Sequence, residues 1–111
     1  MIGYKVVERR NKKLESVGVL VGFGGGVRYV KNRETKPIRG CGPLAVFRSL
    51  RDAMDFWGTT DREWTVYRCH YTPSRKRAVW NRWNRLFPIK LFWLPPGTRL
   101  ATSVTLLERV K

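Results

Sequence analysis

The amino-acid sequence predicts an α+β fold, a mainly antiparallel sheet of five to seven strands with two helices packed on it. Three observations predict this class. Several runs rich in valine, threonine and aromatic residues have the composition or the alternation of apolar and polar positions that strands show. Glycine, proline and asparagine separate these runs. Only residues 49–57 and 75–86 repeat apolar side chains every three to four positions, as helices do.

The chain has the size of one domain. Its 111 residues are 42% apolar and 13% aromatic, which is sufficient for one core without a metal or a disulfide. No internal repeat, low-complexity tail or second domain is visible in the sequence. Residues 1–111 are therefore expected to fold as a single unit.

The first strands of the sheet are predicted to form a hairpin. Residues 3–8 are rich in β-favouring side chains, and residues 14–22 place Val17, Val19 and Val21 on one side of a second strand. A polar turn at residues 11–13 lies between them. These two strands are therefore expected to pair.

Irregular structure is expected to follow the hairpin. The glycine-rich residues 22–26 lead into the strand-like residues 27–30, not into a helix, and they lack the Gly-Lys-Ser/Thr ending of a phosphate-binding loop. We interpret them as a hairpin loop or bulge. Residues 31–43 contain two prolines, two glycines and four cations, which predicts an exposed loop that either connects strands or binds a ligand. Residues 44–47 are predicted to form a short buried strand.

Residues 49–57 have the clearest helical pattern. Ser49 and Asp52 resemble a capping box with Asp in place of Glu, and Gly58 is placed to end the helix. The apolar stripe of this helix, which we expect to face the core, consists of Leu50, Ala53, Met54 and Trp57, with Phe56 beside it.

Three more strands are expected in the second half of the chain. Residues 64–71 alternate so that Tyr67, Cys69 and Tyr71 share one face, which we expect to be buried. Residues 89–94 are a further strand candidate, and a Pro-Pro-Gly turn at residues 95–97 follows them. Residues 103–110 are predicted to be the closing strand.

A basic amphipathic helix is predicted over residues 75–86. Its apolar positions include Val79, Trp80, Trp83 and Leu86, and its opposite face is mostly cationic. A helix of this kind can lie along a phosphate backbone.

The charge balance is the strongest functional signal. The chain has 23 basic and 8 acidic residues, a net charge of +15, and 15 of the cations are arginine, which binds phosphate in a bidentate manner and stacks on rings. No carboxylate lies between Glu63 and Glu108, and cations alternate with aromatic residues there. Positive charge beside flat rings fits a polyanion with stackable bases.

We therefore expect non-enzymatic binding of nucleic acid, RNA or DNA, mainly through phosphate and with low sequence specificity. Trp80 or Trp83 either stacks on a base or packs the helix onto the sheet. The expected phosphate-binding residues are Arg75, Lys76, Arg77, Arg82 and Arg85, with Arg68 and Lys90 at the margin.

Two alternatives come from other classes of function. The first is an interaction module, an inhibitor or adaptor and possibly viral, that docks on an acidic protein surface. The second is a small enzyme acting on nucleic acid or nucleotide through Cys41, His70 or a carboxylate. Residues 40–57 and 94–108 resemble small proteins of phages and archaeal viruses in general character; the resemblance identifies no family and gives no residue a role.

Neither a cofactor nor a metal is expected. One histidine excludes a mechanism that uses a histidine pair, and two cysteines with that histidine cannot supply four Cys/His ligands to zinc. The chain shows no signal peptide and no apolar run of about 20 residues that would span a membrane. A cytoplasmic protein with reduced cysteines and no membrane partner is therefore expected.

Overall fold

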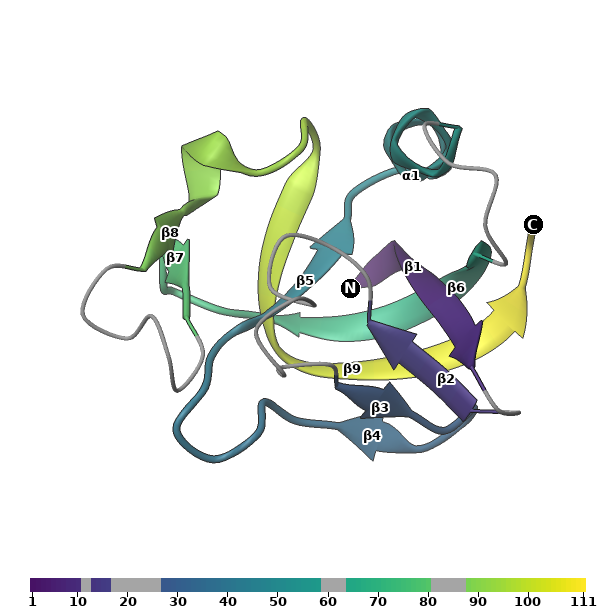
Figure 1. Cartoon of the computed structure of the whole chain (residues 1–111), viewed down its shortest axis with the longest axis horizontal. Coiled ribbons are helices and arrows are strands. Elements are labelled where there is room, and N and C mark those ends of the chain that lie inside the picture. The colour runs from purple at the N-terminus through teal and green to yellow at the C-terminus, as the bar shows by residue number, and fades with distance from the viewer. Residues whose placement is uncertain (11–12, 17–26, 59–63, 81–87) are drawn as a thin grey trace.

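The computed structural model describes residues 1–10, 13–16, 27–58, 64–80 and 88–111. Within these ranges the protein is mostly antiparallel sheet with one α-helix (Figure 1). The prediction of a sheet-dominated α+β fold is therefore confirmed at this level, whereas the second helix is not found among the described residues.

Nine strands are described, seven of which form the main sheet and two a separate hairpin (Figure 1). The main sheet contains β1 (Ile2–Arg10), β2 (Lys13–Ser16), β3 (Arg28–Tyr29), β4 (Glu34–Thr35), β5 (Leu44–Phe47), β6 (Trp64–Pro73) and β9 (Thr98–Arg109). The separate hairpin contains β7 (Ala78–Val79) and β8 (Ile89–Lys90). The helix is α1 (Leu50–Trp57), and one turn of 3-10 helix, η2 (Leu91–Trp93), follows β8.

Four strands of the main sheet close into a ring. β1 pairs with β6, β6 with β9, β9 with β5, and β5 returns to β1 at Tyr4 and Phe47. β6 and β9 are the long curved strands in Figure 1, and register shifts interrupt their ladder at Arg68/Cys69 and Thr72/Pro73. Bulges of this kind increase local bending, which a small closed ring requires.

The alternation of the strands divides the apolar side chains between two cores. The larger core consists of Val7, Tyr29, Leu44, Val46, Cys69, Tyr71, Ala101, Val104 and Leu106. Cys69 and Tyr71 are buried here as predicted, and Tyr67 packs against the cluster. The smaller core lies under α1 and consists of Val6, Phe47, Ala53 and Val66.

Helix α1 begins as its sequence predicts, but Leu50, predicted to face the core, lies at the first helical position and is 39% exposed. Ser49 is the N-cap, and its Oγ accepts a hydrogen bond from the backbone N–H of Asp52 at 3.1 Å. Ala53 is fully buried, and Met54 packs against the smaller core. Gly58 ends the helix with φ of −65°, so it closes the last turn without the left-handed conformation that is common at this position.

The predicted basic helix is wrong over residues 75–80. Residues 74–77 are irregular, β7 follows, and Trp80 forms an isolated bridge with Gly42. Three adjacent cations at residues 75–77 would lie at the positive end of a helix dipole, which disfavours a helix start there. Cross-strand hydrogen bonds to β8 and Gly42 satisfy the backbone instead. Residues 81–87, the remainder of the predicted helix, lie outside the described residues.

Three other predictions are modified by the structure. Residues 89–94 form only the two-residue strand β8, and η2 then replaces the expected longer strand. The expected loop at residues 31–43 contains β4, which pairs with β9. The predicted hairpin is confirmed by the pairing of β1 with β2, whereas residues 17–26, which include the glycine-rich stretch, lie outside the described ranges.

Candidate nucleic-acid interface

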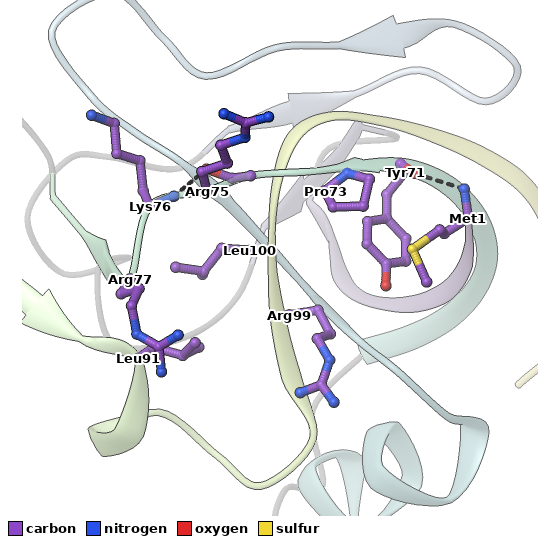
Figure 2. A pocket seen from close by; sticks show the side chains of 10 residues that line it. Met1, Tyr71, Pro73, Arg75, Lys76, Arg77, Leu91, Arg99 and Leu100 are labelled. Carbon is purple, nitrogen blue, oxygen red and sulfur yellow. Dashed lines mark hydrogen bonds between the residues drawn. The ribbon is translucent and has the colours of Figure 1, made fainter.

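An open pocket of about 480 Å³ lies where the end of β6 passes beside the start of β9 (Figure 2). Leu100 is buried at 4% exposure and lies at its centre in this view, with Tyr71 and Pro73 on one side. Its cationic lining residues are Arg75, Lys76, Arg77 and Arg99. A pocket of this volume falls within the range of about 300–1,000 Å³ that is typical of small-molecule sites.

The chain reaches this position because β6 ends at Pro73. Proline has no N–H for the ladder, and the register shifts at Thr72/Pro73. The next residue is still attached to the sheet, since the Ser74 N–H donates to the carbonyl of Leu100 at 2.9 Å. The Ser74 hydroxyl then accepts from the N–H of Lys76 at 3.0 Å, which turns the chain so that three consecutive cations follow.

The β7–β8 hairpin holds the other wall. The Leu91 N–H donates to the carbonyl of Arg77 at 2.8 Å, so η2 begins directly beside the basic segment. Trp80 exchanges two backbone hydrogen bonds with Gly42, of 2.7 and 3.0 Å. A Cβ atom at Gly42 would lie 3.2 Å from the Trp80 indole, so glycine permits this close packing. Trp80 therefore attaches the hairpin to residue 42.

The pocket cations have no acidic partner in the described part of the chain. Described ion pairs lie elsewhere: Lys36–Glu34, Arg48–Asp52 and Arg68–Glu108. Arg99 donates to the carbonyl of Thr98 at 3.2 Å, and all four cations are exposed. Positive charges gathered in a concave site with no carboxylate lining raise the local potential for an anion.

Two aromatic rings are exposed directly beyond the pocket. Phe92 is 75% and Trp93 is 62% exposed, although both are large apolar side chains. Their ring centroids are 5.3 Å apart in an edge-to-face arrangement. The Lys90 ammonium lies 5.9 Å from the Phe92 centroid and 5.6 Å from the Trp93 centroid. A cation and two exposed aromatic rings therefore lie side by side on this surface.

The residues predicted to bind nucleic acid divide into three groups. Arg75, Lys76 and Arg77 all line the pocket, and Lys90 lies on the adjoining hairpin. Arg68 does not line the pocket, and its Nε donates to Glu108 at 2.6 Å. Trp80 is half-buried against Gly42. The remaining three, Arg82, Trp83 and Arg85, lie outside the described residues.

Arg99, Phe92 and Trp93 are not among the residues predicted for the site. A turn is predicted at residues 95–97. Because this turn brings the chain back toward the sheet, it is the signal that could have placed Arg99 near the pocket. Four consecutive apolar residues begin at Leu91. One strand face cannot bury all four, so this run was the available signal for exposed rings.

The alternative of a small enzyme has little geometric support among the described residues. His70 is exposed, with its Nε2 at 3.3 Å from the amino nitrogen of Met1, whereas the neighbouring Cys69 is fully buried. Burial raises the pKa of the Cys69 thiol to about 11, which disfavours the nucleophilic thiolate. Within the described ranges, no three His, Cys, Asp or Glu side chains gather in a group that could hold a metal ion.

One buried charge lies apart from this surface. Lys5 is 6% exposed, its Nζ donates to the carbonyl of Ala45, and it lies 5.3 Å from the ring centroid of Tyr29. Burial lowers the pKa of Lys5 to about 8 and raises that of Tyr29. The Tyr29 hydroxyl has no hydrogen-bond partner among the described residues. These groups lie at the larger core and do not line the pocket.

None of the described helices is both long and apolar enough to cross a membrane. Comparison with protein-family models, curated proteins and solved structures finds no match for this chain.

Proposed function

We propose that this protein binds nucleic acid without catalysis, through phosphate groups held at the pocket between β6 and β9. One observation carries the proposal: Arg75, Lys76, Arg77 and Arg99 line one concave site, and none of its described lining residues is acidic. Guanidinium groups bind phosphate oxygens through paired hydrogen bonds, which an isolated ammonium cannot do. The described lining residues include no histidine or carboxylate that could act as a general base for cleavage.

The proposed contact set is small, so the expected affinity is moderate. Phosphate contacts of this kind give dissociation constants of about 10⁻⁶ to 10⁻⁴ M at physiological salt. Because the contacts are made to the backbone, the affinity is expected to vary little with base sequence. It should fall as salt rises, since each neutralised phosphate releases counterions.

Charge reversal at the pocket tests this proposal. Arg75→Glu/Arg77→Glu replaces two attractive contacts with repulsive ones and is expected to weaken binding at least about tenfold for every nucleic acid. The slope of log K against log salt should flatten by about 1 to 2. The measurement is fluorescence anisotropy with labelled RNA and DNA, single-stranded and duplex, from about 50 to about 200 mM salt.

A matched control separates the pocket from net charge. Lys31→Glu/Arg33→Glu makes the same change in charge on the exposed turn between β3 and β4 and should change the affinity less than about threefold. Equal losses in both variants would show that net charge, not the pocket, controls binding. No measurable binding of wild-type protein to any of the four nucleic acids would refute the function itself.

A further inference from the structure

We propose that the preferred ligand is a single strand, RNA or DNA, with unpaired bases that stack on Phe92 and Trp93 while a neighbouring phosphate occupies the pocket. This inference rests on the proposed function and specifies its substrate class. It depends on the exposure of the two rings, on their distance from the pocket and on the inaccessibility of base faces in a duplex.

The exposure of the two rings gives the first argument. Both follow Leu91 on η2, and they are 75% and 62% exposed, in contrast to Tyr29, which is 2% exposed. In an edge-to-face pair one ring covers only one face of the other, and the interplanar angle here is 68°. Ring surface therefore remains open to a flat partner. Stacking on a base would bury this surface and is tolerant of base identity.

The distance to the pocket gives the second argument. Leu91 itself lines the pocket, and its N–H is hydrogen-bonded to Arg77 at 2.8 Å. Consecutive Cα atoms are about 3.8 Å apart, so the Cα of Trp93 lies within about 8 Å of that of Leu91. One nucleotide links its base and its phosphate over a comparable reach. A phosphate at Arg77 would therefore place an adjoining base at the rings.

The structure of nucleic acids gives the third argument. In a duplex the base faces are stacked on one another, and only base edges are open in the grooves. Stacking on Phe92 or Trp93 would require a base to leave the helix, at a cost of a few kcal/mol. A single strand presents these faces without that cost. Lys90, which lies beside both rings, adds a cation where the adjoining phosphate would pass.

The test compares one sequence in three forms: a single strand, its duplex and an abasic strand with the same phosphates. Phe92→Leu/Trp93→Leu keeps apolar bulk and removes both rings, so affinity for the single strand should fall at least about fivefold. Binding to the duplex and to the abasic strand should change less than about twofold, since neither offers free base faces. Phe92→Tyr/Trp93→Phe retains the rings and should restore most of the affinity. Circular dichroism melting confirms that each variant is folded.

The outcomes distinguish the two proposals. If the wild type binds the duplex as tightly as the single strand, or if the leucine variant weakens all three forms equally, the preference for single strands is overturned. In that case the proposed phosphate site would still stand if Arg75→Glu/Arg77→Glu weakens binding to all three forms. The same titrations with RNA and with DNA of one sequence show whether a 2′-hydroxyl adds affinity.

Discussion

Basic side chains have opposite roles at different places in this molecule. On β1, Lys5 points into the larger core between Gly3 and Val7, and among the described residues it is the one charged side chain that is buried. On the exposed surface, arginine and lysine side chains at residues 75–77 remain available to an anion. The sequence alone does not separate these roles, because a lysine in an alternating strand suits either face.

The buried amine makes stability depend on pH. The pKa of Lys5 is about 8 in the folded protein and 10.5 when exposed, so between these values the unfolded state binds more protons. Its contribution to the free energy of unfolding therefore rises with pH, and below pH 8 the buried charge is a cost. Relative to Lys5→Met, the wild type should gain about 2 to 3 kcal/mol from about pH 7 to about pH 10.

Urea unfolding at both pH values measures this difference. Both proteins retain Cys69, whose raised pKa acts in the opposite direction, so most of its contribution cancels in the comparison. Lys31→Met removes an exposed lysine and serves as the control, with a pH dependence equal to that of the wild type. Parallel curves for the wild type and Lys5→Met would contradict the burial of this charge.

At the scale of elements, the turn before β9 positions both the helix and the pocket. The Thr98 N–H donates to the carbonyl of Pro95 at 3.2 Å, with Pro96 and Gly97 between them and Gly97 at φ of +82°. A Cβ atom on Gly97 would lie 2.2 Å from the Asp52 carboxylate. That carboxylate accepts a hydrogen bond from the Ser49 hydroxyl at the start of α1. The turn and the helix start therefore fit only with glycine.

Gly97→Ala should destabilise the protein by about 2 to 3 kcal/mol, because the left-handed backbone is strained and Asp52 must move. Gly40, on an exposed turn with φ of +85°, provides the control, and Gly40→Ala should cost only the backbone strain, about 1 kcal/mol. Urea unfolding gives both values. Equal losses would mean that contact with Asp52 contributes nothing.

Elements with a strong local signal were predictable, and those defined by distant partners were not. Helix α1 followed from its cap and apolar stripe, and β6 from its alternation. β4 and β7 are two residues long, too short for any periodicity to show, and each exists because of its cross-strand partner. The spacing of Val79/Trp80, Trp83 and Leu86 suited a helix. Adjacent cations at residues 75–77 and the pairing of Trp80 with Gly42 oppose one.

The candidate site was predictable in composition and only partly in position. The carboxylate-free second half of the sequence indicated an anion-binding surface, and the cluster at residues 75–77 lies in the pocket. Arg99 joins it from β9, more than twenty residues away, because β5 and β6 both pair with that strand. Contacts of this kind depend on the closure of the four strands into a ring, which no local pattern in the sequence predicts.

For the whole molecule, the net charge of +15 and the fold act together. Self-repulsion of this size opposes compaction, and the closed ring of strands with two cores maintains the fold against it. The β7–β8 hairpin stands at one side of this ring in Figure 1, with the C-terminus on the other. A ligand is therefore expected to contact the hairpin side of the molecule.

An NMR titration of the uniformly labelled protein with a mixed-sequence single strand tests that claim most directly. Amide shift changes should concentrate at residues 74–77, 90–93 and 98–100, and they should saturate together. Residues 31–36 and 108–111, which also carry exposed cations, should shift little. Changes spread evenly over all exposed cations, or confined to residues outside the pocket and the hairpin, would contradict the account.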